Sequence, residues 1–234
     1  MPAALVTGAA SGIGKATADR LRADGYDVVG FDLEDGDLST REGNKLAVDT
    51  ALERFGRLDV IVANAGVQHV APVKDFPEDR WDALLAILLT SPFLLAKYAW
   101  EPLTASEQGR FIVVASAHAL VASPFKAAYV AAKHGVLGLV RTLALEGGPH
   151  GLTANAVCPG YVRTPLVERQ LPDQAKTHNL SEEEALEQVI LEPHAVKRLI
   201  EPEEVAGVIA FLASPGGAAF SGAPVTMDLG WSAR

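Results

Sequence analysis

The sequence predicts a single α/β domain whose parallel sheet carries helices on both faces. Short apolar runs of strand length alternate with helical stretches along the chain, which is the pattern of repeated βαβ units. The 234 residues suit one such domain, and the 49% of hydrophobic residues are ample for its core. No internal repeat or low-complexity linker divides the sequence.

The first unit has the order strand, glycine-rich turn, helix. Residues 3–6 are an apolar run of strand length, and residues 15–23 have helical character. Between them, Gly8 permits a tight turn, Gly12 lets the backbone approach a pyrophosphate, and Gly14 lets helix and strand pack closely. The helix N-terminus favours negative charge. An ordinary glycine-rich turn is the alternative, but the flanking strand and helix favour a dinucleotide site.

An acidic residue follows the second predicted strand. Residues 26–31 form this strand, and Asp32 stands at its C-terminal end. It lies roughly 20 residues past the glycine turn, where a carboxylate bonds the adenosine ribose hydroxyls. A carboxylate there repels a 2′-phosphate, so it favours NAD over NADP. The alternative is a solvated acid in an acidic loop, since Glu34, Asp35 and Asp37 follow closely.

A tyrosine and a lysine four residues apart are the strongest catalytic signal. Tyr129 and Lys133 belong to an alanine-rich segment that is predicted to be helical over residues 129–146. Residues four apart share one face of a helix. A nearby ammonium favours the phenolate and lowers the tyrosine pKa from its ordinary value of about 10. The pair is therefore a candidate general acid or base, with an ordinary surface pair as the alternative.

Composition excludes several classes of protein. A net charge of -9 and a pI near 5.1 argue against nucleic acid as a partner. No membrane span is expected, because the longest apolar candidate, residues 83–100, is interrupted by Pro92 and carries Lys97. The strand that follows Met1 leaves no room for a signal peptide. The single cysteine, Cys158, excludes an internal disulfide and suits a reducing cytoplasm.

Five motifs in the right order resemble those of the short-chain dehydrogenase/reductase family, over essentially the whole chain. They are the glycine motif at residues 7–14, Asn64-Ala65-Gly66 after the apolar run 60–62, Ser116 after the strand 111–114, Tyr129 with Lys133, and Pro159-Gly160 with Thr164 following. The resemblance implies a Rossmann-like doubly wound parallel sheet and an NAD-dependent, cytoplasmic dehydrogenase.

The resemblance also implies a role for each matching residue. Tyr129 would be the general acid or base, Lys133 would lower its pKa and bind the nicotinamide ribose, and Ser116 would position the substrate oxygen. Thr164 would hold the nicotinamide carboxamide. The positions implied to bind NAD are Gly8, Ser11, Gly12, Ile13, Gly14, Asp32, Asp37, Leu38, Asn64, Ala65, Gly66, Tyr129, Lys133, Pro159, Gly160, Val162 and Thr164. No metal ion is expected.

Two segments differ in length from many family members. Little room for a full crossover helix remains between Asp32 and the helical segment 46–55, so the chain is expected to run almost straight to residues 36–38, which resemble a strand end that brackets the adenine. The segment 161–201 is a long insertion between the last two sheet units. It contains a helix start at Ser181, with acids in the first turn, and by resemblance forms a substrate lid.

One position of the family's catalytic tetrad departs from the pattern. The family usually has asparagine where this chain has Leu88; that asparagine maintains a helix irregularity, and its main-chain carbonyl binds a water that leads to the catalytic lysine. Pro92 stands four residues on and has no N–H to bond the Leu88 carbonyl. We expect Pro92 to free that carbonyl and so to preserve the water relay. The alternative is a slower or partly disabled enzyme.

Four further residues match a subgroup of the family, the D-3-hydroxybutyrate dehydrogenases. By resemblance Gln68, His118, Lys126 and Gln170 bind the substrate carboxylate, so the substrate is a small 3-hydroxy acid and the product acetoacetate or a similar acid. Charge-assisted hydrogen bonds of roughly 1.5–3 kcal/mol each suit a substrate that offers little apolar surface. Departures such as Tyr161, where the subgroup often has tryptophan, leave the exact chain length open.

Three alternatives remain. The chain can be a dehydrogenase of a sugar, polyol or other secondary alcohol, which leaves Lys126 without a role. It can reduce 3-oxoacyl groups on a carrier protein with NADPH, against which Asp32 argues. It can also be an NAD-binding sensor without turnover, which only Leu88 favours. The resemblance further implies a homotetramer, with contacts from the helix after Tyr129 and from the C-terminal strand at 224–229.

Overall fold

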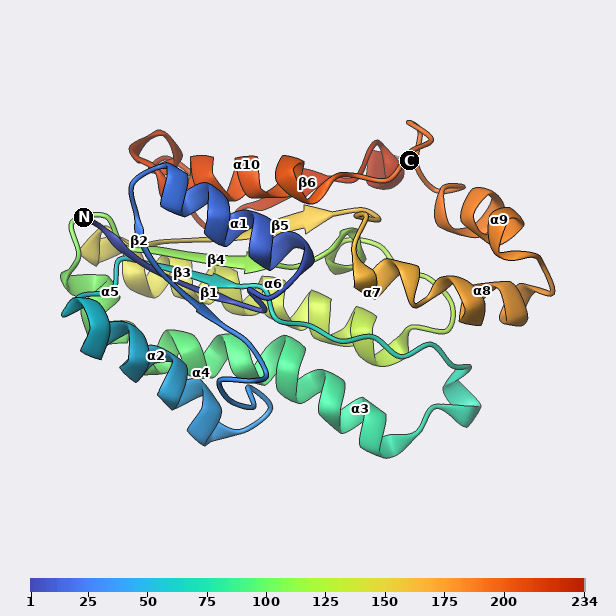
Figure 1. Ribbon diagram of the computed structural model, residues 1–234, viewed down its shortest axis with the longest axis horizontal. Helices are drawn as coiled ribbons and strands as arrows, with labels where there is room; N and C mark the ends of the chain where they lie inside the picture. The colour runs from blue at the N-terminus through green and yellow to red at the C-terminus, as the bar shows by residue number, and fades with distance from the viewer. Residues whose placement is uncertain (234) are drawn as a thin grey trace.

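A six-stranded parallel sheet forms the centre of the protein (Figure 1). The computed structural model describes residues 1–233. The strand order is β2-β1-β3-β4-β5-β6, and the strands are β1 (Ala3–Thr7), β2 (Asp27–Phe31), β3 (Val60–Ala63), β4 (Arg110–Val114), β5 (Thr153–Pro159) and β6 (Pro224–Met227). The inner strands are fully buried, because helices cover both faces, and they are therefore apolar almost throughout.

Helices form one layer on each face of the sheet (Figure 1). The helices α1 (Gly12–Ala23) and α10 (Pro202–Ala213) pack together on one face. The other face carries α2 (Arg41–Phe55), α4 (Ser91–Tyr98) and α6 (Ala127–Gly147), with α3 (Glu78–Leu85) and α5 (Trp100–Ala105) at the ends of α4. The expected doubly wound parallel fold is confirmed, and the predicted helix 129–146 is the central part of α6.

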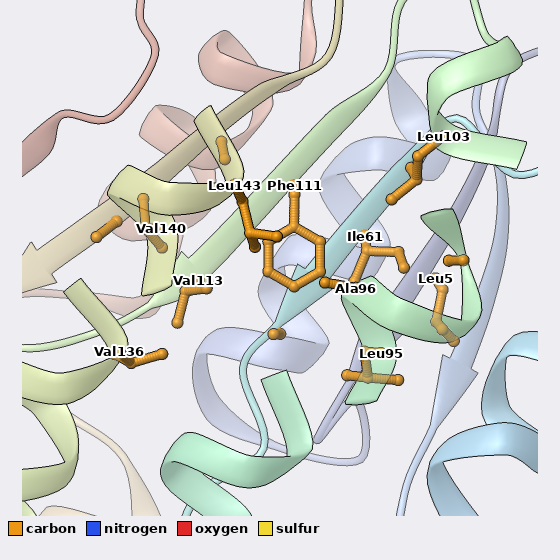
Figure 2. Close-up of a cluster of buried hydrophobic side chains, with 14 of the residues drawn as sticks. Leu5, Ile61, Leu95, Ala96, Leu103, Phe111, Val113, Val136, Val140 and Leu143 are labelled. Atoms are coloured by element: carbon orange, nitrogen blue, oxygen red, sulfur yellow. The ribbon is translucent and has the colours of Figure 1, made fainter. Parts of the chain in front are cut away.

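The core fills the space between the sheet and the α4–α6 layer. Phe111 of β4 is fully buried and lies at the centre of this cluster (Figure 2). Leu143 and Val140 of α6 and Leu95 of α4 surround it in the same cluster. Burying side chains of this size contributes about 1.5–3 kcal/mol each, so the cluster fixes the two layers that carry the catalytic motifs.

The short connection after β2 is as expected. No helix lies between Asp32 and the start of α2 at Arg41; the chain makes turns instead. The helix α2 begins five residues earlier than the predicted 46, because Thr40 caps it by accepting a hydrogen bond from the Gly43 N–H. The segment 36–38 forms no strand, so β2 is the edge of the sheet.

The insertion between β5 and α10 is largely helical. It contains α7 (Pro165–Glu168), α8 (Leu171–His178), α9 (Glu182–Ala185) and a π-helical turn (Leu186–Ile190). The predicted helix start at Ser181 is confirmed, with a capping box between Ser181 and Glu184. A bridge between Val162 and Ile200 closes the base of the insertion, which projects at the right of Figure 1.

One expectation about the helix around Pro92 is wrong. The chain stays helical from Glu78 to Tyr98, a run of 21 residues with a mean hydropathy of 1.3, long and apolar enough to span a membrane by length and composition alone. Pro92 does not break it, because the π-helical turn Ala86–Thr90 precedes the proline and Pro92 falls in the first turn of α4. The run packs on α2 and α6, and Leu84 and Leu95 are buried, as in a core helix.

Candidate active site

A cavity of about 430 Å³ opens at the C-terminal ends of the central strands. In a parallel α/β sheet this is the edge where ligands bind. Every position implied to bind NAD except Gly14 lines this cavity. The additional lining residues include Leu33 and Gly36 from the short connection after β2, Ile87 and Leu88 from the π-helical turn, and Arg169 from the insertion.

The glycine turn has the geometry that a dinucleotide requires. Gly8 and Gly12 have φ angles of 67° and 53°, in the left-handed region that favours glycine. A Cβ at Gly8 would lie 2.8 Å from the Asn64 Nδ2 atom. A Cβ at Gly14 would lie 2.0 Å from the Gly8 carbonyl oxygen, so Gly14 serves the packing of α1 against β1. Ser11, Gly12 and Ile13 line the cavity, so the N-terminus of α1 lies at its wall, where it favours negative charge.

Asn64 joins the glycine turn to the end of β3. Its Nδ2 atom donates to the Thr7 carbonyl oxygen at 2.9 Å, and its backbone N–H donates to the Thr7 Oγ1 atom at 3.0 Å. The Ala65 N–H donates to the same hydroxyl at 3.1 Å. These bonds hold two strand ends in register, so the floor of the cavity is rigid.

Asp32 stands at the end of β2 and lines the cavity. Its carboxylate accepts hydrogen bonds from the backbone N–H groups of Ala10 and Leu33, both at 2.8 Å. These two bonds orient the carboxylate toward the glycine turn. Because carboxylate oxygens have several lone pairs, acceptor capacity remains for ribose hydroxyls. Asp37 and Leu38 line the same cavity, as expected.

The predicted catalytic residues Ser116, Tyr129 and Lys133 all line this cavity. Ser116 lies just beyond β4, and its hydroxyl hydrogen-bonds the Tyr129 hydroxyl. The Lys133 Nζ atom donates to the Val114 carbonyl oxygen at 2.8 Å and lies 5.4 Å from the centroid of the Tyr129 ring. The helix α6 and the strand β4 therefore bring all three together.

The surroundings of Tyr129 and Lys133 disfavour charge on both. Burial raises the pKa of Tyr129 to about 12, which the hydrogen bond from Ser116 opposes. Burial lowers the pKa of Lys133 to about 8. The lowering of the Tyr129 pKa by Lys133 is not seen here, because burial dominates and the ammonium bonds Val114 rather than the phenol.

The π-helical turn Ala86–Thr90 contains Leu88, at the position where the family usually has asparagine. The helix irregularity expected there is present without the asparagine side chain. Leu88 is buried against Leu84, Ala128 and Ala132, so its side chain packs α3 on α6 beside Tyr129. A leucine thus takes a packing role at this position, and the backbone retains the irregular turn.

A second, smaller cavity of about 50 Å³ adjoins Ser116 and Tyr129. All four residues implied to bind a substrate carboxylate line it, although they come from four separate segments: Gln68, His118, Lys126 and Gln170. A single water needs only ~10–15 Å³ by this measure, so the cavity accommodates a small molecule.

Lys126 is the only one of these four with a charge. It is 3% exposed, and burial lowers its pKa to about 8. Within residues 1–233 it forms no ion pair; its Nζ atom donates to the Tyr161 hydroxyl at 2.8 Å. Phe125, the preceding residue, has a φ of 66°, a strained conformation for a non-glycine residue. A buried cation without a carboxylate partner favours an anionic ligand.

His118 is neutral in this site. Burial and the neighbouring Lys126 ammonium lower the pKa of His118 to about 3. Its Nδ1 atom lies 3.3 Å from the Ser116 Oγ atom, and its Nε2 atom lies 3.0 Å from the Ser123 Oγ atom. Both ring nitrogens are engaged by serine hydroxyls, so the imidazole also helps to orient Ser116.

The two glutamines that line the small cavity come from segments far apart in the sequence. The Gln68 Oε1 atom accepts a hydrogen bond from the His69 N–H at 3.0 Å. The Gln170 Nε2 atom donates to the Leu166 carbonyl oxygen at 3.0 Å, while its Oε1 atom is buried and has no hydrogen-bond partner among residues 1–233. Each amide retains hydrogen-bonding capacity for a ligand.

Several residues of the small cavity are not predicted by sequence motifs. Tyr161, Leu166, Val167 and Trp231 complete its apolar wall. Trp231 stacks on Tyr161 with ring centroids 5.5 Å apart and an interplanar angle of 10°. Only its position soon after the last strand distinguishes this tryptophan in the sequence, so no local pattern identifies it.

Comparisons with known proteins agree with this geometry. Residues 34–232 match the family profile described as enoyl-(acyl carrier protein) reductase, and residues 2–40 match the profile described as short chain dehydrogenase. The chain therefore belongs to the short-chain dehydrogenase/reductase family, a family of oxidoreductases.

Two curated relatives span nearly the full chain. It is 42% identical over 254 residues to a D-beta-hydroxybutyrate dehydrogenase of Rhizobium meliloti (strain 1021), with 99% of this chain and 98% of the relative covered. It is 39% identical over 252 residues to a D-beta-hydroxybutyrate dehydrogenase of Cupriavidus necator, with the same coverage. Both alignments are longer than the chain's 234 residues, so each relative has residues that this chain lacks.

Solved structures show the same fold. Levodione reductase has 30% identity and a TM-score of 0.92, with 100% of this chain and 98% of that structure covered. The aldohexose dehydrogenase of Thermoplasma acidophilum has 27% identity and a TM-score of 0.91, with 100% and 94% covered. Enzymes named for different substrates share this fold, so the substrate must be argued from the small cavity.

Proposed function

We propose that the protein is an NAD-dependent dehydrogenase that interconverts (R)-3-hydroxybutyrate, or a similar small 3-hydroxy acid, and the corresponding 3-oxo acid, acetoacetate. The observation that carries the proposal is Lys126. Its buried ammonium has no carboxylate partner within residues 1–233, and it lines the same small cavity as Ser116 and Tyr129. The substrate carboxylate supplies the missing counter-charge.

The chain's own groups handle the proton and the substrate oxygen. In the oxidation, Tyr129 accepts the hydroxyl proton, and Ser116 hydrogen-bonds the same oxygen and fixes its position. The Lys133 ammonium, which bonds the Val114 carbonyl oxygen in this structure, favours the phenolate that this step needs once it turns toward the Tyr129 hydroxyl. A nicotinamide cofactor supplies the hydride chemistry. In the reduction, the neutral Tyr129 phenol favoured by burial donates the proton to the ketone oxygen.

The cofactor is proposed to be NAD. The glycine turn and the N-terminus of α1 fit a pyrophosphate, and Asp32 fits the ribose hydroxyls. A 2′-phosphate would meet the Asp32 carboxylate, whose two backbone hydrogen bonds hold it in place. NADP is therefore disfavoured by like-charge repulsion.

The test is NADH formation by purified protein from (R)-3-hydroxybutyrate and NAD⁺. The (S) enantiomer and NADP⁺ are the paired controls. We expect turnover that is selective for the (R) acid and for NAD⁺. NAD⁺ binding without product from either enantiomer contradicts the hydroxy-acid assignment and favours another alcohol or a sensor without turnover.

We further propose a cytoplasmic homotetramer. Leu145 of α6 is 80% exposed, and Phe93 of α4 on the same face of the sheet is 45% exposed, so apolar side chains remain on this layer. Such side chains suit a subunit contact. Sedimentation of the purified protein tests this assembly, and a monomer at micromolar concentration contradicts it.

A further inference from the structure

Tyr161 lines the small cavity and contacts the buried Lys126 ammonium. It follows the Pro159-Gly160 turn and lies 35 residues from Lys126 in the sequence, yet its hydroxyl accepts the only hydrogen bond that the Lys126 ammonium donates within residues 1–233. The Lys126 Nζ atom also lies 4.8 Å from the Tyr161 ring centroid. An aromatic hydroxyl thus stands where a buried lysine ordinarily finds a carboxylate.

The backbone and ring of Tyr161 are held firmly. Its N–H donates to the His194 Nε2 atom at 3.2 Å, and its carbonyl oxygen accepts from the Ile200 N–H at 2.9 Å. Trp231 stacks on the Tyr161 ring with centroids 5.5 Å apart. Because each of these contacts reaches Tyr161 from a different segment, its hydroxyl is preorganised before any ligand binds.

Strained backbone flanks both partners of Tyr161. Phe125, directly before Lys126, has a φ of 66°, and Leu229, two residues before Trp231, has a φ of 53°. Non-glycine residues in the left-handed region cost of order 1–3 kcal/mol and cluster at functional sites. The fold therefore retains strain at both segments that meet the Tyr161 ring.

The hydroxyl proton of Tyr161 has no acceptor within residues 1–233. The hydroxyl oxygen accepts from Lys126, and no other hydrogen bond is made by this group. Burial raises the pKa of Tyr161, so the hydroxyl keeps its proton at neutral pH. A donor and a cation therefore stand side by side in one small cavity without an anion between them.

We propose that Tyr161 is a direct ligand of the substrate carboxylate and that its O–H and the Lys126 ammonium form a two-donor clamp, one donor for each carboxylate oxygen. The proposal deepens the function proposed above and rests on it. Charge-assisted bonds from two preorganised donors are stronger than neutral ones and add direction. Gln68 and Gln170 then complete the surroundings of the ligand.

The clamp defines the substrate class more closely. It recognises a free carboxylate. An ester, amide or thioester carries no negative charge, so Lys126 would remain without a counter-charge when one of these is bound. Leu166 and Val167 line this cavity, and its volume of about 50 Å³ favours a short acid over a long acyl chain. The substrate is therefore a short, free 3-hydroxy acid rather than a group on a carrier.

The test compares Tyr161→Phe with wild type, because phenylalanine keeps the ring and its stacking and removes only the hydroxyl. Tyr26→Phe is the matched control: it also removes a hydrogen-bonded hydroxyl, which donates to the Ala213 carbonyl oxygen in the α1–α10 layer. Acetoacetate binding is measured by calorimetry in the presence of NAD⁺, a pair that cannot react. We expect Tyr161→Phe to lower the affinity for acetoacetate about tenfold or more. Its affinity for NAD⁺ should be unchanged, and Tyr26→Phe should bind acetoacetate as the wild type does.

A readout specific to the clamp is the pH dependence of acetoacetate binding. Loss of the acceptor hydroxyl favours neutral Lys126, so the loss of binding at alkaline pH moves to lower pH in Tyr161→Phe. Equal acetoacetate affinity and an equal pH profile in wild type and Tyr161→Phe overturn the clamp while leaving turnover, and hence the proposed function, intact. Turnover of (R)-3-hydroxybutyrate by wild type is scored separately, so failure of the proposed function is recognised on its own.

Discussion

Pro92 follows Leu88 by four residues within one continuous helical run, and the turn between them is π-helical. The family usually has an asparagine at the Leu88 position, and the irregular turn is present here without it. Leucine supplies buried packing at this turn, and proline withholds the N–H that would bond the Leu88 carbonyl in a regular α-helix. We infer that the proline favours the irregular turn beside Tyr129.

Pro92→Ala should lower turnover more than stability. Alanine adds an N–H that can bond the Leu88 carbonyl and so favours a regular helix. The Leu88 carbonyl would then no longer be free to bind the water that leads to Lys133. We expect kcat to fall at least about threefold, with an unfolding free energy within about 1 kcal/mol of wild type. Pro102→Ala, in the separate helix α5, is the matched control. Unchanged kcat in Pro92→Ala contradicts this account.

Lys126→Met should stabilise the folded protein and weaken the binding of the 3-hydroxy acid. The folded-state pKa of Lys126, about 8, lies below its ordinary value of 10.5 because the ammonium is buried. Below pH 8 the full cost of burying the charge is present, and it is relieved as pH rises from 8 to 10.5. Removing the charge should raise the unfolding free energy at pH 7 by roughly 2–3 kcal/mol.

The difference in unfolding free energy between Lys126→Met and wild type should decrease as the pH rises from 8 to 10.5. Urea unfolding at pH 7 and pH 10 measures the change, and Lys97→Met, an exposed lysine of α4, is the control. The same Lys126→Met variant should raise the KM for (R)-3-hydroxybutyrate by at least about tenfold. A destabilised variant with an unchanged KM would show that Lys126 is structural.

Mild acid should destabilise the protein through two histidines. Burial holds the pKa of His118 at about 3, and burial also lowers the pKa of His194, whose ring nitrogens contact the Tyr161 N–H and the Arg198 carbonyl oxygen. His118 stays neutral in the fold in mild acid, and His194 is harder to protonate in the fold than a free imidazole, whereas in the unfolded chain both take up protons near pH 6.5. The stability that depends on the neutral rings is therefore complete above that pH and is lost as the pH falls below it, by up to about 1.4 kcal/mol per pH unit for His118 and by less for His194.

Urea unfolding between pH 6.5 and pH 5 measures this slope before most carboxylates titrate. His194→Gln should reduce the slope, whereas His150→Gln, an exposed position, should leave it unchanged. A flat profile in the wild type would show that neither histidine is held neutral.

Asp32→Asn should relax the choice of cofactor. The amide can still accept one of the backbone hydrogen bonds from Ala10 and Leu33, but it no longer repels a 2′-phosphate. We expect the ratio of kcat/KM for NAD⁺ over NADP⁺ to fall by at least about tenfold. Asp24→Asn, at the exposed C-terminal end of α1, is the control. An unchanged ratio would show that the Asp32 carboxylate serves only the backbone of its own loop and does not contact the ribose.

The parts predicted from the sequence are those that local patterns encode. The strand, turn and helix around Gly8, the strand end at Asp32 and the helix that carries Tyr129 follow from short apolar runs, glycine spacing and helical periodicity. The packing of Gly14 against Gly8 follows for the same reason. Each depends on residues that are close together in the chain.

The parts that sequence patterns do not predict depend on contacts between distant segments. Tyr161 meets Lys126, and Trp231 stacks on Tyr161, only because β5, the start of α6 and the C-terminal segment end at the same edge of the sheet. The continuation of the helix through Pro92 is missed because proline ordinarily disrupts helices, and the π-helical turn that accommodates it has no composition of its own.

The proposed function depends above all on the buried Lys126 ammonium, which is expected to select a free carboxylate. The most direct measurement is kcat/KM of the wild-type protein with NAD⁺ for (R)-3-hydroxybutyrate and for its methyl ester, which has the same reacting centre without the charge. The account predicts that the acid is preferred by at least about a hundredfold. Equal kcat/KM for acid and ester would contradict it, because Lys126 would then not contact the substrate.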